Sequence, residues 1–189
     1  MDEIVNLITD FGGHMKKGIV ISFTGSGGVD IPLLYYSVSI FSNKGYDVER
    51  VHCKCLDKKE FEELYENIKE YIISLNLSNY EDVVFVSKSL GTYFSCKIKD
   101  ELRIPARLVL YTPVEETVPY MKGDNDIILV AAGDADKFMS EDRLVSICSK
   151  ENLPCLIEKG VGHSMEISND LSKNLLVVQD VISKLQTLI

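Results

Sequence analysis

Basic residues are scarce in this chain of 189 residues. It contains 20 Lys and Arg against 29 Asp and Glu, which gives a formal net charge of -9 at pH 7. The averaged field of such a chain repels polyanions, and no run of basic residues is longer than a pair such as Lys16-Lys17. We therefore expect no nucleic-acid partner.

Long apolar runs are also absent. No stretch approaches the roughly 20 apolar residues that span a bilayer. The segment Met1-Asp2-Glu3-Ile4 has neither the positive charge nor the long apolar stretch of a secretory signal. These absences predict a cytoplasmic protein that has no membrane partner.

Cysteines are few and scattered. Their number is five, which is odd, and this pattern is more typical of reduced core thiols than of a disulfide framework. One residue separates Cys53 from Cys55, whereas a zinc site requires wider spacing within a pair and two further ligands. The sequence therefore predicts neither a metal nor any other cofactor. The five are Cys53, Cys55, Cys96, Cys148 and Cys155.

The composition is that of one compact domain. Hydrophobic residues make up 46% of the chain and charged residues 26%. The sequence has no internal repeat, no low-complexity tract and no Pro/Ser linker, and the long loop expected at residues 113–125 is too short for a helical lid. We expect a single domain over residues 1–189, with no cap domain.

Apolar runs of strand length alternate with longer segments of helical period. This alternation predicts an α/β fold in three layers, a mostly parallel sheet of six or seven strands between helices on both faces. The expected strands are residues 17–23, 48–53, 82–87, 107–112, 127–132 and 154–158, with a weaker candidate at 3–8. The expected helices are residues 32–43, 58–74, 90–99, 141–150 and 172–188.

The change from strand to helical period at residues 82–99 falls on Ser87-Lys88-Ser89-Leu90-Gly91. A tight strand-turn-helix strains the backbone of its central residue and requires small residues two positions before and after it. Ser87 and Gly91 meet that requirement. The turn also aims backbone N–H groups of the next helix at the central serine, where they stabilise an oxyanion. Ser89 is therefore the predicted nucleophile, and Leu90 a predicted oxyanion donor.

These residues resemble the α/β-hydrolase superfamily, whose nucleophile turn usually reads Gly-x-Ser-x-Gly and whose triad follows in the order nucleophile, acid, histidine. Gly133-Asp134-Ala135-Asp136 follows one expected strand and is similar to the family's acid loop. Gly160-Val161-Gly162-His163 follows the next strand and is similar to its histidine loop. The resemblance implies the α/β-hydrolase fold and a catalytic triad of Ser89, His163 and Asp136.

The resemblance extends upstream, to about residue 17. The first strong strand opens into Thr24-Gly25-Ser26-Gly27-Gly28, similar to the family's His-Gly-x loop, which implies that the Ser26 N–H is the second oxyanion donor. Two positions depart from the family pattern, because Ser87 replaces the first glycine and Thr24 the common histidine. The glycine-rich turn lacks the Lys-Ser/Thr of a phosphate loop, and Asp30 stands where a dinucleotide fingerprint needs glycine.

The chain offers few rivals for the triad roles. His14 precedes the first strong strand and His52 falls within an expected strand, so neither has the required chain order. Asp134 remains a rival to Asp136 for the acid role, since a turn residue after glycine fits either position. Glu115 and Glu116, in the loop at 113–125, are further alternatives.

Other polar residues near Ser89 receive structural interpretations. We expect Ser87 and Ser95 to be packing or helix-surface hydroxyls. We expect Lys88 to be solvated.

The predicted function is hydrolysis of a small ester, thioester or related acyl substrate through an acyl-enzyme. Loops at residues 25–31, 113–125 and 137–140 are expected to border a shallow cleft. Its candidate lining residues are Tyr35, Tyr36, Tyr120, Met121, Phe138 and Met139. Two alternatives stay open, a non-catalytic α/β-hydrolase-like binding module and an acyltransferase that uses the same triad. The oligomeric state is also open.

Overall fold

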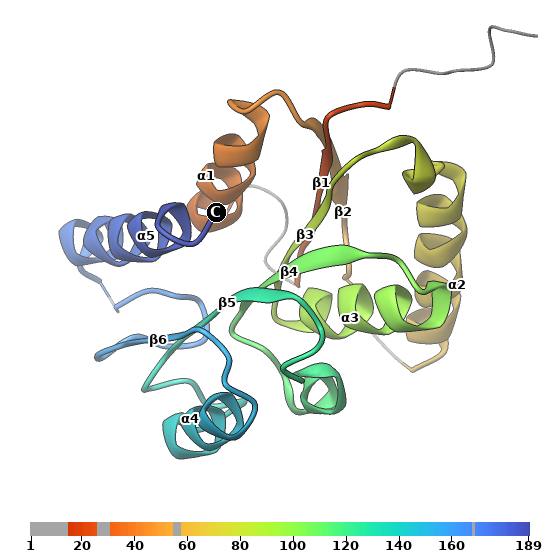
Figure 1. Cartoon of the computed structure of the whole chain (residues 1–189). Helices are drawn as coiled ribbons and strands as arrows, with labels where there is room; N and C mark the ends of the chain where they lie inside the picture. The colour runs from red at the N-terminus through yellow and green to blue at the C-terminus, as the bar shows by residue number, and fades with distance from the viewer. Residues whose placement is uncertain (1–14, 26–30, 55–57, 168) are drawn as a thin grey trace, which may run out of the picture.

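A computed structural model describes residues 15–25, 31–54, 58–167 and 169–189. Within these residues the sheet has six strands, all parallel, in the order β2-β1-β3-β4-β5-β6 (Figure 1). The strands are β1 (Ile19–Phe23), β2 (Asp47–Val51), β3 (Val83–Lys88), β4 (Ala106–Tyr111), β5 (Ile127–Gly133) and β6 (Cys155–Glu158). The helices are α1 (Pro32–Ser42), α2 (Lys58–Ser74), α3 (Leu90–Leu102), α4 (Glu141–Lys150) and α5 (Leu171–Gln186).

Helices cover both faces of the sheet, which confirms the predicted α/β architecture. Helices α1 and α5 lie on one face, and α2, α3 and α4 lie on the other (Figure 1). Alternate strand residues feed the two cores, so that Phe85 of β3 packs toward α3 and Val86 toward α1 and α5. Because a parallel sheet is buried on both faces, its central strands are mostly apolar and could be predicted from the sequence, whereas the edge strand β2 is mostly polar.

The boundaries of the elements differ from expectation at a few points. Strand β2 ends at Val51, so the prediction that His52 lies within a strand is wrong, and its side chain is exposed. Helix α3 continues to Leu102, beyond the expected end at residue 99. The loop at 113–125 contains a short 3-10 helix, η3 (Glu115–Tyr120), and another, η2 (Leu77–Asn79), precedes β3. The weak strand candidate at residues 3–8 lies outside the described residues.

The strand order indicates where a ligand would be expected to bind. The chain passes from β1 to β2 on one side of the sheet, then returns to β3 on the other side of β1. Ligands of open α/β sheets bind at such a reversal, beyond the carboxyl ends of the strands. All six strands end at the same edge because they are parallel, so Gly25, Ser89, Asp136 and His163 follow strands that meet there.

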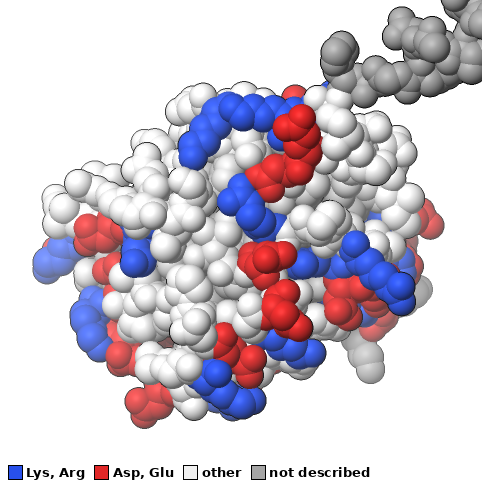
Figure 2. Space-filling view, viewed as in Figure 1, with Lys and Arg blue, Asp and Glu red and all other residues white. Residues whose placement is uncertain are grey.

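Acidic and basic side chains are interspersed over the face shown in Figure 2. None of the helices in the described ranges is long and apolar enough to cross a membrane.

Candidate active site

Ser89 lies between β3 and α3 in a conformation that L-residues rarely adopt, with φ 55° and ψ -127°. Its neighbours fix this backbone from both sides. The Ser89 N–H donates to the carbonyl of Tyr111 at 3.0 Å. The Ser89 carbonyl accepts the Thr92 N–H at 2.9 Å and the Thr92 hydroxyl at 2.7 Å. Strain of this kind persists only where the surroundings impose it, and it is typical of functional sites.

Two glycines make room for the turn. A Cβ on Gly91 would lie 2.3 Å from the carbonyl oxygen of Phe23, because α3 crosses the end of β1 there. A Cβ on Gly25 would lie 2.8 Å from the Cβ and 3.2 Å from the Oγ of Ser89. Sequence reasoning singled out Gly91 but missed this role of Gly25, which follows from a contact between strands distant in sequence.

Ser87, at the position of the first glycine of the usual motif, belongs to a buried network of hydroxyl groups. The Ser87 hydroxyl donates to the Val109 carbonyl at 3.2 Å and accepts the Ser95 hydroxyl at 3.0 Å. The Thr92 and Thr117 hydroxyls lie 2.7 Å apart beside it. All four residues are buried. We call Ser87, Ser95, Thr92 and Thr117 the hydroxyl cluster; for Ser87 and Ser95 the packing interpretation is confirmed.

Ser89, His163 and Asp136 form a continuous chain of hydrogen bonds. The His163 Nε2 lies 2.8 Å from the Ser89 Oγ. The His163 Nδ1 lies 2.8 Å and 3.0 Å from the two carboxylate oxygens of Asp136. A carboxylate accepts only, so Nδ1 carries the proton and Nε2 is free to accept the serine proton. The structure therefore brings together the three residues predicted for the triad.

The environment of Asp136 keeps it ionised. Its carboxylate is fully buried, whereas one-fifth of the His163 side chain is exposed. Burial by itself raises the pKa of Asp136, but hydrogen bonds from His163 and from the Phe138 and Met139 backbone outweigh it and bring the pKa below its usual value. The Phe138 N–H donates to one carboxylate oxygen at 2.8 Å. Asp136 is thus a carboxylate at neutral pH, able to orient the imidazole.

The rival acids have other partners. Asp134 accepts the Gly160 N–H at 2.7 Å and lies 3.6 Å from the Lys159 ammonium, so it supports the turn that precedes His163. Glu115 pairs with Arg143 at 3.5 Å, and Glu116 is exposed. The geometry thus favours Asp136 over each of them. His14 lies outside the described residues.

The prediction that Lys88 is solvated is wrong. Only 5% of its surface is exposed, and its ammonium donates to the carbonyl oxygen of His163 at 2.8 Å. Burial lowers the pKa of Lys88 to about 8, although the charges of Asp136 and Glu166 oppose that shift. The sequence carried no signal for this contact, because a lysine at the end of a strand is usually solvated.

Of the two predicted oxyanion donors, only Leu90 lies within the described residues. Leu90 is the first residue of α3, so its N–H has no carbonyl partner within the helix and lies beside Ser89. Ser26 lies outside the described residues. Thr24, at the family's histidine position, is buried and its N–H donates to the Val51 carbonyl at 3.0 Å.

Phe138 is an exposed aromatic residue beside His163. Its ring centroid lies 4.4 Å from that of His163, and 63% of its surface is exposed. Among the other residues proposed to line a cleft, Met121 and Met139 are buried in the core, whereas Tyr35 and Tyr36 are exposed on α1. Among the described residues proposed to line a cleft, only Phe138 has a ring contact with His163.

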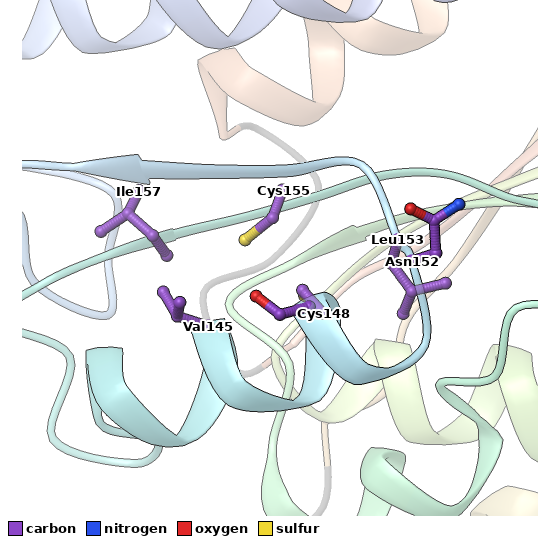
Figure 3. Close-up of a pocket in the computed structure, with 7 residues that line it drawn as sticks. Val145, Cys148, Asn152, Leu153, Cys155 and Ile157 are labelled. Carbon is purple, nitrogen blue, oxygen red and sulfur yellow. The ribbon is translucent and has the colours of Figure 1, made fainter.

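A hollow of about 320 Å³ between α4 and β6 is separate from these residues (Figure 3). The Cys155 sulfur points toward α4, where Cys148 also lines the hollow. Cys96, Cys148 and Cys155 are free thiols, and Cys96 and Cys148 are buried, as is Cys53. Cys55 lies outside the described residues. No group of three metal-ligating side chains occurs in the part of the chain that the structure describes.

Comparison with known proteins shows similarity of structure. No family model and no curated protein matches the sequence. An alpha-beta serine hydrolase homologue from Coxiella burnetii has a TM-score of 0.59 and 15% identity, with 88% of each chain covered. A Xanthomonas campestris member of the α/β serine hydrolases without a lid has a TM-score of 0.57 and 15% identity, with 89% of this chain and 79% of that chain covered.

A third similar structure covers more of both chains. It is a protein from Xanthomonas campestris pv. campestris assigned provisionally to the α/β-superfamily hydrolases, with a TM-score of 0.63 and 15% identity. The alignment covers 91% of this chain and 99% of that chain. At this level of identity the likeness concerns the course of the backbone. Together with the parallel six-stranded sheet between two helical layers, it identifies the fold of this chain as the α/β-hydrolase fold.

Proposed function

We propose that the protein is a serine hydrolase that cleaves a small ester, thioester or related acyl substrate. The observation that carries the proposal is the chain of hydrogen bonds from Ser89 through His163 to the buried Asp136. This chain of hydrogen bonds begins at Ser89, a strained residue at the N-terminus of α3. The order and geometry of the three residues are those that nucleophilic acyl transfer requires. The α/β-hydrolase fold supports it, since this fold presents such a serine at the carboxyl edge of its sheet.

Acylation begins with the transfer of a proton. His163 Nε2 accepts the Ser89 hydroxyl proton as Oγ attacks the substrate carbonyl, and the Asp136 carboxylate stabilises the imidazolium that forms. The Leu90 N–H, at the positive end of the α3 dipole, donates to the oxyanion. The tetrahedral intermediate collapses as His163 gives the proton to the leaving group, which leaves an ester on Ser89.

Deacylation repeats these steps with water. His163 takes a proton from a water molecule that attacks the acyl ester, and the proton then returns to the Ser89 oxygen. Because His163 acts as a base in both halves, the reaction requires its unprotonated form, and turnover is expected to fall in acid. Activity that is flat between about pH 5 and 8 would contradict this mechanism.

The environment of His163 bears on the substrate. The Phe138 ring lies against the imidazole of His163 and is largely exposed. A substrate bound at Ser89 would therefore contact this aromatic ring next to His163. We infer that the acyl group or the leaving group has an apolar portion that packs on this ring. A panel of p-nitrophenyl esters and acyl thioesters of increasing chain length tests this inference through kcat/KM.

A fluorophosphonate probe tests the nucleophile. We expect one adduct on Ser89, located by mass spectrometry, and none in Ser89→Ala. Ser164→Ala is the matched control, because Ser164 is exposed in the same loop as His163 and has no role in the mechanism. An unlabelled wild-type protein, or a label that persists in Ser89→Ala, would refute the assignment. Labelling without turnover of any ester or thioester would instead favour acyl transfer to an acceptor other than water.

A further inference from the structure

We propose that Lys88 is a positioning residue for the histidine of the triad, and that its charge sets an alkaline limit on the reaction. This inference rests on the proposed serine hydrolase function. The observation behind it is the hydrogen bond from the Lys88 ammonium to the His163 carbonyl, 2.8 Å long, between two residues 75 positions apart. Lys88 directly precedes Ser89, so one side chain links the nucleophile's strand to the base's loop.

The buried location of the Lys88 ammonium is energetically unfavourable. Lys88 is 5% exposed, and burial of a charged amine is costly. Burial lowers its pKa to about 8. At that value most Lys88 side chains are still protonated at neutral pH, and the ammonium N–H donates a charge-assisted hydrogen bond to a backbone carbonyl.

The loop that carries His163 is held near its start by a hydrogen bond from the Gly160 N–H to the Asp134 carboxylate at 2.7 Å and by one from the Ala135 N–H to the Val161 carbonyl at 3.0 Å. Its internal bonds run from the Gly162 N–H to the Glu166 carbonyl at 3.1 Å and from the Met165 N–H to the Gly162 carbonyl at 3.0 Å. These bonds close the turn on itself. The bond from Lys88 joins the His163 backbone to the end of β3, a central strand paired on both sides. The loop that carries the imidazole and Ser89 are therefore both attached to the same strand, β3.

The charged and titratable groups around Lys88 determine how it responds to pH. The carboxylates of Asp136 and Glu166 favour the ammonium, and the His163 residue accepts its hydrogen bond. When pH rises through about 8 the amine becomes neutral, and its hydrogen bond to the His163 carbonyl weakens. We expect the wild-type rate of Ser89 modification to fall several-fold on the alkaline side, since neutral donors bond roughly half as strongly.

The effect of the Lys88 charge on folding stability distinguishes a positioning role from a role in packing. Because the pKa of Lys88 is lower in the folded than in the unfolded state, the unfolded chain binds more protons between about pH 8 and 10.5. The contribution of Lys88 is therefore unfavourable below about pH 8, and it is relieved as pH rises above that value. Replacement by an uncharged chain of similar length should leave the thermal midpoint at pH 7 unchanged or higher.

Lys88→Met is the test, with Lys99→Met as its matched control. Lys99 is also a buried lysine whose ammonium donates to a backbone carbonyl, that of Ile104 at 3.5 Å, but it lies in the last turn of α3. The fluorophosphonate labelling rate at Ser89 is measured from pH 6 to 10. We expect Lys88→Met to label about 10- to 100-fold more slowly and without the alkaline decline. We expect Lys99→Met to behave as wild type.

Two further measurements keep the inference open to refutation. Hydrogen exchange of the segment at residues 159–167 should be faster in Lys88→Met, and its thermal midpoint should not fall. Lys88→Arg remains charged throughout this pH range and should lack the alkaline decline. A wild-type rate and profile in Lys88→Met, unchanged exchange, or a persistent decline in Lys88→Arg would overturn the role of Lys88 and leave the serine hydrolase intact. An unlabelled wild-type protein would overturn the proposed function itself.

Discussion

Two buried polar clusters flank Ser89, and they differ in charge. The hydroxyl cluster lies beneath the turn, where hydroxyl groups bond to one another and to backbone carbonyls. On the other side the carboxylate of Asp136, the imidazole of His163 and the ammonium of Lys88 form an ionic cluster. Neutral hydroxyls that are hydrogen-bonded cost little to bury, whereas charges are costly to bury even when paired.

The difference separates two tasks. The hydroxyl cluster comes from β3, α3 and η3 and bonds to the Val109 carbonyl of β4, so it connects the elements that shape the turn. The ionic cluster joins the loops after β5 and β6 to β3, and it contains the groups that titrate. We therefore expect changes in the ionic cluster to reduce activity and alter its pH dependence. Changes in the hydroxyl cluster should affect stability first.

The largest effect is expected for His163→Asn. Loss of the base removes the group that accepts the Ser89 proton, and turnover should fall roughly 10⁵- to 10⁶-fold. Hydrolysis of a p-nitrophenyl ester measures it. His52→Asn is the control, because that histidine is exposed and lies beyond β2. Comparable losses in both variants would contradict the assignment of His163 as the base.

Asp136→Asn should follow, with kcat reduced about 10⁴-fold, since the amide no longer favours the tautomer in which Nε2 accepts. Asp134→Asn should retain activity, because Asp134 bonds to the Gly160 N–H and not to the imidazole. The two variants differ by two positions and make the sharpest test of the acid. A greater loss of turnover in Asp134→Asn would reverse their roles.

Acid titration of stability adds an independent readout for Asp136. Its folded pKa lies below the ordinary value, so the stability due to the ionised carboxylate is present above about pH 4 and is lost as pH falls through the folded pKa. Urea unfolding at several acidic pH values should show a shallower dependence in Asp136→Asn than in wild type. Equal slopes would mean that Asp136 does not contribute this linkage.

Gly25→Ala should have an intermediate effect. The added methyl would lie 2.8 Å from the Ser89 Cβ, so the serine must move, and kcat is expected to fall about 100-fold. Gly123→Ala introduces a contact of 2.7 Å with the Glu151 carbonyl, remote from Ser89. It should lose stability by about 1 to 3 kcal/mol while the folded fraction keeps full activity. Equal activity in the two folded variants would show that Gly25 does not shape the nucleophile's surroundings.

The elements of the fold could be predicted from the sequence because each is encoded locally. Strands such as β3 and β4 are buried on both faces and are therefore mostly apolar, interrupted only by Ser87, Lys88 and Arg107, while α2 repeats its apolar residues at helical spacing. The roles of Asp136 and His163 were implied by the resemblance to the α/β-hydrolase superfamily, and the triad candidates could be located because Ser89, Asp136 and His163 each follow a strand whose end could be predicted.

Contacts between distant segments could not be predicted in this way. The bond from Lys88 to the His163 carbonyl and the approach of Gly25 to Ser89 depend on how loops meet at the sheet edge. The sequence around Lys88 and around Gly25 gives no sign of these contacts. The preference for Asp136 over Asp134 depended in the same way on the side that each carboxylate faces after β5, a matter of turn geometry.

The smallest effect is expected in the hydroxyl cluster, for Ser87→Gly, which restores the glycine of the usual motif. The change removes the hydroxyl that donates to Val109, but Ser95 keeps an acceptor in the Thr92 carbonyl at 3.1 Å. Urea unfolding should show a loss of about 1 to 2 kcal/mol, from one hydrogen bond and the flexibility of glycine in a strand. Turnover should change by less than about tenfold, since the turn is still set by Gly91 and the Ser89 contacts. Ser95→Ala leaves the bond from Ser87 to Val109 in place and should cost less stability. A large loss of turnover in Ser87→Gly would mean that the hydroxyl cluster also aligns the nucleophile, and the division between the two clusters would fail.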